Sequence, residues 1–220
     1  MNHETTRLAE LVATLFDLKR IKRTGWLDRG APLDAVESVA DHSFLTALVA
    51  WLVALDRPDL DADRVLKLAV IHDIAEAIVG DIPPYAPDDV PDASDPDALQ
   101  AFFSVRHRRT DVAAEEKRAA EQLAIQHLAT RMPPAAGAAV LDLWEEYEAR
   151  ETAEARFVKE VDTLEAFLES RAMASRFQEL PLWGFTDMAN KEIGDPGLAG
   201  LRDAASAVMG RSEAARKSNR

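Results

Sequence analysis

The sequence predicts an all-α protein, a helical bundle formed by a single domain. In most segments apolar residues recur every three or four positions, which is the spacing of an amphipathic helix. No segment shows the alternation of apolar and polar residues that is typical of a half-buried strand. A length of 220 residues suits one domain with a substantial core. We therefore expect one helical domain over residues 1–210.

The first two helices follow from apolar spacing and capping signals. Residues 8–21 have the pattern of an amphipathic helix that ends near Thr24-Gly25. A second helix is expected over residues 38–55. The Ser38 hydroxyl can cap its start, with Asp41 as the partner in a capping box.

The rest of the chain is predicted in the same way. A third helix should run from Asp61 or Asp63 to about Val79, with Gly80 as a left-handed cap. The proline-rich stretch 82–96 is a loop or an ordered lid. The tail 211–220 is small and polar, and we expect it to fray. Further helices are expected over residues 98–105, 111–131, 134–150, 152–178 and 196–209.

The composition excludes several classes of function. The formal net charge is −13, and a chain this acidic repels the backbone of DNA or RNA. A small phosphorylated ligand stays possible where positive charge gathers, as in residues 19–23. That segment can equally be a solvated helix end. Because the chain has no cysteine, any metal must be bound by histidines and carboxylates.

The sequence also indicates the compartment. The longest apolar run, residues 44–55, is interrupted by Thr46 and is too short to cross a bilayer. The segment Met1–Thr6 lacks the charged and apolar regions of a secretion signal. We expect a cytoplasmic protein without a membrane partner.

The pair His72-Asp73 is the most informative feature of the chain. It lies in an apolar helical stretch, where an imidazole and a carboxylate are costly to desolvate unless something compensates them. A divalent cation would compensate both. His42 and Asp162 occupy comparable settings, and the set of two nitrogen and two oxygen ligands suits Mn, Fe, Co, Ni or Zn. Taken singly, each residue could instead be a hydrogen-bonded core histidine or a capping aspartate, so residue types alone leave both readings open.

Several strings of the sequence resemble one branch of a known family. The pattern H…HD…D, formed by His42, His72-Asp73 and Asp162, is the signature of the HD-domain metal-dependent phosphohydrolases. The resemblance covers about residues 8–82 and 113–175. Its 5′-deoxynucleotidase subfamily has similar strings, in the same order, at Leu18–Trp26, Glu37–Ser43, His72–Ile82, Leu143–Glu148 and Glu154–Glu165.

The resemblance implies a helical bundle that hydrolyses deoxyribonucleoside 5′-monophosphates to the nucleoside and phosphate. It also implies a homodimer. One divalent ion (Mn, Co, Fe, Ni, Zn or Mg) would be bound by His42, His72, Asp73 and Asp162.

The same resemblance implies roles for other residues. Glu76 and Asp81 match an acidic catalytic pair. Our hypothesis is that Glu76 orients or deprotonates the attacking water, while Asp81 donates a proton to the departing 5′ oxygen or holds it. Arg23 matches a phosphate-binding arginine. Trp26 matches an aromatic residue that closes the sugar pocket against a 2′-hydroxyl, although in some relatives the arginine and tryptophan are adjacent, whereas here Thr24-Gly25 separates them.

One segment departs from the family pattern. Residues 83–114 replace a short loop and include the basic run Arg106–Arg109. This insertion follows directly on the predicted site. It could be a lid that changes substrate choice toward a more highly phosphorylated nucleotide, or a surface excursion or dimer contact.

Other members of the superfamily suggest alternative functions. Two-metal HD phosphodiesterases and di-iron HD oxygenases carry extra histidines before the last aspartate, and His107 and His127 could act in that way. A nucleotide polyphosphate hydrolase is a further alternative. Finally, the helices could be a non-catalytic interaction module with a structural ion, which leaves Glu76 and Asp81 unexplained.

Overall fold

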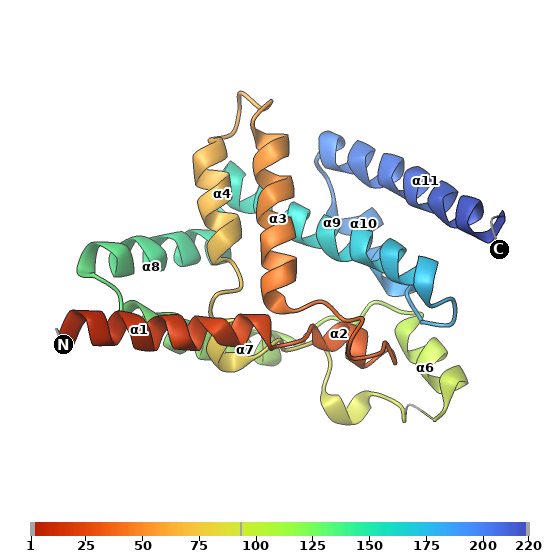
Figure 1. The fold of residues 1–220 in the computed structure, drawn as a ribbon, viewed down its shortest axis with the longest axis horizontal. Coiled ribbons are helices and arrows are strands. Elements are labelled where there is room, and N and C mark those ends of the chain that lie inside the picture. Colours follow the sequence, from red (N-terminus) through yellow and green to blue (C-terminus); the bar gives the residue numbers. More distant parts are fainter. Residues whose placement is uncertain (1–2, 93, 219–220) are drawn as a thin grey trace.

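The computed structural model describes residues 3–92 and 94–218, which fold almost entirely into helices (Figure 1). Within these ranges the one extended pairing is an antiparallel bridge between Lys22 and Ser38. The all-α prediction is confirmed. In chain order the elements are α1 (His3–Leu15), η1 (Phe16–Lys19), α2 (Thr24–Leu27), α3 (Val39–Ala54), α4 (Ala62–Ile71), α5 (Glu76–Val79), η2 (Pro87–Asp89), α6 (Pro96–Phe103), α7 (Asp111–Ala129), α8 (Pro134–Ala149), α9 (Ala153–Arg176), α10 (Trp183–Glu192) and α11 (Pro196–Ser218).

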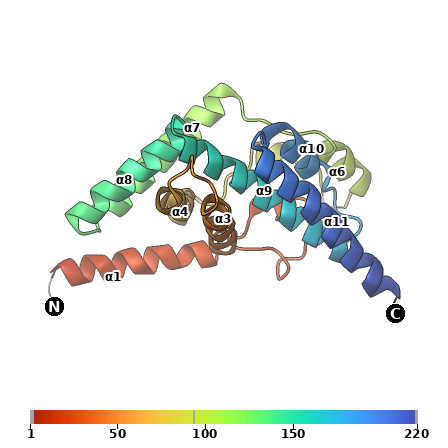
Figure 2. The ribbon, with the colours of Figure 1, turned by 90° about the horizontal axis from the view of Figure 1, so that it is seen from above.

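Helices α3 and α4 form an antiparallel hairpin that α9 crosses (Figures 1 and 2). The predicted capping box is confirmed, because Ser38 Oγ accepts from the Asp41 N–H and the Asp41 carboxylate accepts from the Ser38 N–H. Asp61 caps α4 by accepting from the N–H groups of Asp63 and Arg64. These caps satisfy amide groups that would otherwise lack a partner at each helix start.

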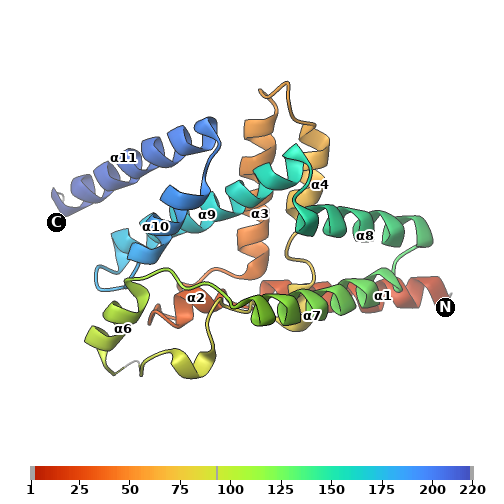
Figure 3. The same ribbon diagram turned by 180° about the vertical axis from the view of Figure 1, so that it is seen from behind.

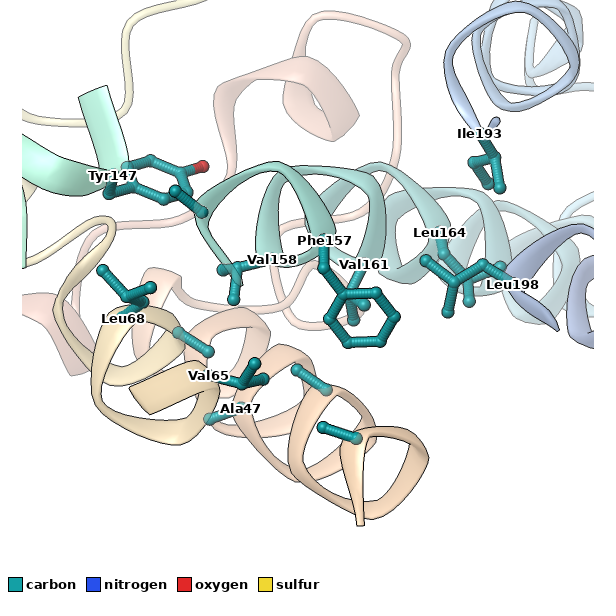
Figure 4. Packing of buried hydrophobic residues seen from close by; sticks show 14 of the residues in the cluster. Ala47, Val65, Leu68, Tyr147, Phe157, Val158, Val161, Leu164, Ile193 and Leu198 are labelled. Carbon is teal, nitrogen blue, oxygen red and sulfur yellow. The ribbon is translucent and has the colours of Figure 1, made fainter. Parts of the chain in front are cut away.

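The main core lies where α9 crosses the hairpin (Figure 4). Large buried side chains of α9 pack on small and branched residues of α3 and α4, and the segments around α10 and α11 close the far end. Because α3 carries His42 and α9 carries Asp162, this packing also brings polar residues from distant parts of the chain together. The core residues labelled in Figure 4 are Ala47, Val65, Leu68, Tyr147, Phe157, Val158, Val161, Leu164, Ile193 and Leu198.

The third helix is not continuous, which corrects the sequence prediction. α4 ends at Ile71, and the chain passes through a turn before α5. In this turn the N–H of Glu76 donates to the carbonyl of Asp73 (3.0 Å), three residues back rather than four. His72 Nδ1 binds the carbonyl of Ala69 (2.8 Å), the group that a continuous helix would pair with the Asp73 N–H. His72 and Asp73 therefore lie on a tightened turn, not inside a helix.

Gly80 ends α5 in a conformation that only glycine adopts readily. Its φ is 78° and its ψ is 170°, so the positive φ agrees with the prediction while the extended ψ is not that of a left-handed helix. This turn directs the chain from α5 into Asp81. The backbone of Gly80 thus sets where the Asp81 carboxylate points.

A short extended pairing positions the start of α3. The N–H of Arg23 donates to the Glu37 carbonyl (3.2 Å), and the N–H of Val39 donates to the Ile21 carbonyl (3.0 Å). The pairing fixes Arg23 beside the helix that carries His42. It is too short to appear as strand alternation in the sequence.

Other helix boundaries also differ from the prediction. The expected helix over residues 8–21 ends at Leu15 and is followed by η1. Helix α10 was not predicted. The last helix continues to Ser218, so the chain is helical from Arg211 to that residue and not frayed as expected. Residues 219–220 lie outside the described part. Figure 3 shows α10 beside α9 on the opposite side of the bundle from α3.

None of the helices in the described part of the chain combines the length and apolar character that a membrane span requires.

The packing predicts how the core responds to a cavity. Leu68 is fully buried in the main core, whereas Val70 on the same helix is 53% exposed. We expect Leu68→Ala to lower the free energy of unfolding by about 2–5 kcal/mol, through lost burial and a residual cavity. Val70→Ala is the control and should change it by less than about 0.5 kcal/mol. Urea titration followed by circular dichroism measures both, and equal losses would contradict this packing.

Candidate metal centre

Two imidazoles face each other inside the bundle. His42, from the first turns of α3, and His72, from the turn after α4, are 0% and 3% exposed. Their Nε2 atoms lie 3.4 Å apart. Helix α9 supplies Asp162 to the same place, and one oxygen of this residue lies within 4.8 Å of both nitrogens.

The partners of the Nδ1 atoms define the tautomers. His72 Nδ1 lies 2.8 Å from the carbonyl oxygen of Ala69, which can only accept a hydrogen bond. His42 Nδ1 lies 2.5 Å from a carboxylate oxygen of Glu165, which is 1% exposed. In neutral imidazoles with both protons on Nδ1, the two Nε2 atoms present lone pairs toward each other. Such an arrangement is repulsive unless a positive charge lies between them. Burial and the charge of Arg23 lower the pKa of His42, but the hydrogen-bonded carboxylates of Asp162 and Glu165 raise it to about 10, so in the absence of a metal ion a proton on His42 supplies this charge.

Two carboxylates complete this donor set. Asp162 Oδ1 lies 3.2 Å from His42 Nε2, and Asp73 Oδ2 lies 3.1 Å from His72 Nε2 and 3.6 Å from His42 Nε2. Burial opposes ionisation of both aspartates, yet Lys159 and His42 lower the pKa of Asp162, and His72 and Arg23 lower the pKa of Asp73. The four predicted ligands therefore converge, with two oxygens in their anionic form.

The residues present fit a divalent cation. A positive charge among these donors would replace the lone-pair repulsion of the two imidazoles and balance the two carboxylates. Mixed nitrogen and oxygen donors suit Mn, Fe, Co, Ni or Zn, and the donor set by itself does not select among them.

Polar residues behind the ligands hold them in place, and the sequence analysis missed them. Lys159 Nζ donates to Asp162 Oδ2 (2.7 Å), and the Tyr147 hydroxyl donates to the same oxygen (3.3 Å). This leaves Oδ1 for the centre. Glu165 orients His42 in the same manner. The three-residue spacing of Asp162 and Glu165, which places them on one face of the helix, was the feature of the sequence that could have indicated the role of Glu165.

Glu37, which lies near His42 and Glu165, forms a hydrogen bond with Trp26. The indole Nε1 of Trp26 donates to Glu37 Oε1 (3.0 Å). Burial, and next the charge of Glu165, raise the pKa of Glu37 to about 7. Trp26 is 2% exposed and stacks on Phe185 of α10, with ring centroids 4.2 Å apart. Its position is thus fixed by α10, which the sequence analysis did not predict.

Glu76 is buried beside the centre. Its side chain is 3% exposed, and its Oε2 has no hydrogen-bond partner in the structure. Burial, and then the charges of Asp73 and Asp81, raise its pKa to about 10. A carboxylate in this setting binds a proton strongly.

Asp81 and Arg23 form a second polar group at the centre. Arg23 Nη1 donates to Asp81 Oδ1 (3.1 Å) and lies 3.4 Å from Asp73 Oδ2. The other oxygen, Asp81 Oδ2, accepts from the N–H of Thr24 (2.5 Å). Both oxygens of Asp81 are therefore acceptors, and the guanidinium of Arg23 is held against the donor set.

These residues open into one cavity of about 640 Å³. Its volume lies in the range of small-molecule sites. The wall includes the centre (Asp73 and Asp162), the polar residues beside it (Arg23, Glu76 and Asp81) and part of Trp26. Residues 105–109 of the insertion line it as well. All predicted site residues except the two deeply buried histidines thus border a common space.

Comparison with known proteins establishes the family. Residues 15–180 match the HD domain family. The chain belongs to this family. The 5′-deoxynucleotidase HDDC2 of Xenopus laevis is 39% identical over 163 residues, 74% of this chain and 67% of that protein. The human protein of the same name is 34% identical over 178 residues, with 81% and 72% covered. The 5′-deoxynucleotidase hdd1 of Schizosaccharomyces pombe is 31% identical over 188 residues, with 83% and 80% covered.

Solved structures share the HD-domain fold. The PH0347 protein of Pyrococcus horikoshii has a TM-score of 0.65 at 28% identity, over 92% of this chain and 98% of that one. A protein described as a predicted metal-dependent phosphohydrolase, from Magnetospirillum magnetotacticum, has a TM-score of 0.61 at 24% identity and supports the fold alone. It covers 94% of this chain and 93% of that one.

The extra histidines of this HD domain lie apart from the centre. His107 Nε2 binds the carbonyl of Phe102 (2.9 Å), and its ring stacks on the Phe102 ring. His127 is exposed on α7, whose buried face carries Ala124 and Leu128. Within residues 3–92 and 94–218, neither histidine joins a cluster able to share an ion.

The orientation of His42 by Glu165 can be tested through metal affinity. Glu165→Gln keeps the shape and an acceptor but removes the charge, so we expect Mn²⁺ affinity to fall by ~10–100-fold. Calorimetric titration of the metal-free protein measures this directly. Glu169→Gln, one turn further along α9, is the matched control and should bind like the wild type. Unchanged affinity in the Glu165 variant would contradict the assignment.

Proposed function

We propose that this HD-domain protein is a 5′-deoxynucleotidase that hydrolyses deoxyribonucleoside 5′-monophosphates to the deoxyribonucleoside and phosphate. One observation carries the proposal. A buried set of nitrogen and oxygen donors, a guanidinium and a partnerless buried carboxyl group adjoin a single cavity. Relatives named as 5′-deoxynucleotidases are similar in sequence to this chain over most of its length.

The donor set is proposed to bind one divalent ion through His42, His72, Asp73 and Asp162. When bound, the ion supplies Lewis acidity toward a phosphate oxygen and lowers the pKa of a coordinated water. Lys159 and Tyr147 keep one oxygen of Asp162 turned away from the centre, and Glu165 keeps the Nε2 of His42 turned toward it. This preorganisation avoids rearrangement during the reaction.

Glu76 is proposed to take the proton of the attacking water. Its Oε2 has no partner, so it is free to contact a water in the cavity. Without a metal ion, burial and the charges of Asp73 and Asp81 keep Glu76 protonated. A divalent cation beside Asp73 would offset these negative charges and favour the ionised form of Glu76, which is the form that takes the proton. As the new P–O bond forms and the bond to the 5′ oxygen breaks, Glu76 holds the proton taken from water and then gives it up to the departing 5′ oxygen through the solvent of the cavity, so that protons and charge balance.

Arg23 and Asp81 are proposed to hold the phosphoryl group. The planar fork of Arg23 matches two phosphate oxygens. Asp81 fixes this guanidinium and the first turn of α2 through its two accepting oxygens. Both roles expected of Asp81 concerned the departing 5′ oxygen, which it would protonate or hold. Because both of its oxygens already accept hydrogen bonds, we propose instead that Asp81 positions Arg23.

Trp26 is proposed to close the sugar side of the cavity. Its indole is locked between Glu37 and Phe185, so it cannot move aside at low cost for an additional hydroxyl. A fixed apolar wall at this place would favour the deoxyribose over the ribose by a steric clash.

A homodimer is proposed on the apolar outer face of α3. Phe44, Leu52 and Leu55 are 70%, 51% and 55% exposed on this helix, whose other face lies in the core. A helix that is apolar all round is normally covered on all sides.

Phosphate release from a panel of nucleotides tests the function. We expect release from deoxyribonucleoside 5′-monophosphates, slower release from ribonucleoside 5′-monophosphates, and loss of both after chelation with recovery on adding Mn²⁺ or Co²⁺. Colorimetric phosphate detection is sufficient. A protein loaded with metal that releases no phosphate from any deoxyribonucleoside 5′-monophosphate would overturn the proposal.

A variant of Glu76 tests its role. Glu76→Gln removes the base while keeping the shape, so we expect kcat to fall by ~10²–10⁴-fold with metal content unchanged. Metal content per chain is measured by atomic emission and kcat by phosphate release. Loss of metal in this variant would make Glu76 a ligand and contradict its assignment.

A further inference from the structure

Residues 105–109 of the insertion carry positive charge to the cavity. They follow α6 and line the same space as Arg23, Glu76 and Asp81. In Figure 1 the insertion runs below the bundle, from α5 through α6 and back to the start of α7. The basic run therefore faces the proposed substrate site rather than only solvent.

Aromatic and ionic contacts anchor this segment. Phe103 is fully buried, and the guanidinium of Arg29 lies over its ring at 4.0 Å. The ring of His107 stacks on Phe102 at 4.0 Å between centroids, and Arg106 forms an ion pair with Glu192 of α10. The segment is thus held at both its α6 end and its α10 side.

Backbone packing between the insertion and α10 adds to this anchoring. A Cβ added to Gly184 would lie 3.3 Å from the Phe103 carbonyl oxygen, which is a tight contact. Tyr85, at the start of the insertion, donates from its hydroxyl to Asp28 at the end of α2 (3.0 Å). These contacts hold the insertion against α2 and α10 on the two sides of the segment that leads to Arg109.

Arg109 is a half-buried cation whose hydrogen bonding is incomplete. Its Nη2 donates to the carbonyl of Ile82, the residue after Asp81. No carboxylate oxygen in the described part of the chain lies within 4.0 Å of its nitrogens. Burial lowers its pKa, while the charges of Glu121, Asp81 and Glu76 act in the opposite direction. The guanidinium has five donors, so most of them are left for a ligand.

Most of the other cations of the cavity pair with a carboxylate or lie at its exposed rim. Lys117 pairs with Glu121, Lys159 with Asp162, and Arg106 with Glu192, while Arg23 contacts Asp73 and Asp81. Arg108 and Arg150 are exposed. Arg29 also lacks a carboxylate of the described residues within 4.0 Å, but it is buried, donates to the carbonyls of Gly25 and Pro181, and lies over the rings of Phe103 and Phe185. Among the described residues, Arg109 is therefore the half-buried cavity cation with neither a carboxylate in contact nor such an enclosure.

We propose that Arg109 binds the phosphoryl group of the substrate, so that the insertion supplies a second guanidinium opposite Arg23. The inference rests on the proposed function, because it concerns the phosphate of the same nucleotide. It is carried by the position of Arg109 in the wall of the cavity beside the donor set. There its guanidinium donates to the carbonyl of Ile82, the residue next to Asp81.

The physical reason is charge balance in a partly desolvated space. A phosphate monoester brings about two negative charges to a cavity that already contains several carboxylates. Hydrogen bonds from a guanidinium to such a group are strong and can be bidentate, and a buried cation gains more from them than an exposed one does. Arg109 forms no covalent bond and transfers no proton.

Binding of inorganic phosphate to the Mn²⁺-loaded protein tests the proposal without any turnover. We expect Arg109→Gln to weaken phosphate binding by ~10–100-fold in calorimetry, the range for hydrogen bonds to charged groups. Arg118→Gln on the exposed face of α7 is the matched control and should bind phosphate as the wild type does. The kcat/KM for a deoxyribonucleoside 5′-monophosphate should fall in parallel with phosphate affinity.

Each outcome decides between substrate binding and a structural role. Arg109→Lys keeps the charge but not the planar fork, so it should bind phosphate several-fold more weakly at unchanged melting temperature. If Arg109→Gln does not fold, this second variant decides. The proposal would be overturned if both variants bound phosphate as tightly as the wild type. It would also be overturned if phosphate bound more weakly only in variants that had lost metal and melted at a lower temperature. Failure of the wild type to hydrolyse nucleotides would instead overturn the proposed function, because phosphate binding is measured separately.

Discussion

The structure depends on one electrostatic constraint, which is that two buried imidazole nitrogens and two carboxylates meet at one point and require a positive charge there. The Ala69 carbonyl and the Glu165 carboxylate occupy both Nδ1 atoms, so His42 and His72 direct their Nε2 atoms to the same point. Two ionised aspartates add negative charge there. A cation at this point would balance the carboxylates and bind the imidazole nitrogens. Such compensation lowers the free-energy cost of burying these groups among the helices.

Support for this centre comes from every element that packs around it. The crossing of α9 over the α3–α4 hairpin buries apolar residues on one side and aligns the ligands on the other. Behind the ligands, Lys159 and Tyr147 fix Asp162, while Glu165 and Glu37 connect His42 toward Trp26. Through these contacts the core, the metal ligands and the wall of the cavity form one continuous network.

The cavity combines opposite charges on neighbouring walls. Glu76 and Asp81 lie beside the donor set, and Arg23 and Arg109 approach Asp81 from different segments. A carboxyl group with a raised pKa can exchange a proton there, while guanidinium groups bind anionic oxygens. Several cations line this cavity, so it suits the proposed phosphate monoester although the chain as a whole is acidic.

The sequence alone determined the helical class and the capping box at Ser38, because periodicity and capping are local properties. It also singled out His42, His72, Asp73 and Asp162 as candidate ligands, but only the resemblance to a family joined them into one set. Tertiary structure decided the rest. The break after Ile71, the pairing that places Arg23, and the packing of Phe185 on Trp26 depend on residues far apart in the chain. The helical period could not assign Glu165 and Lys159 their partners, because these partners come from other elements or depend on how α9 packs.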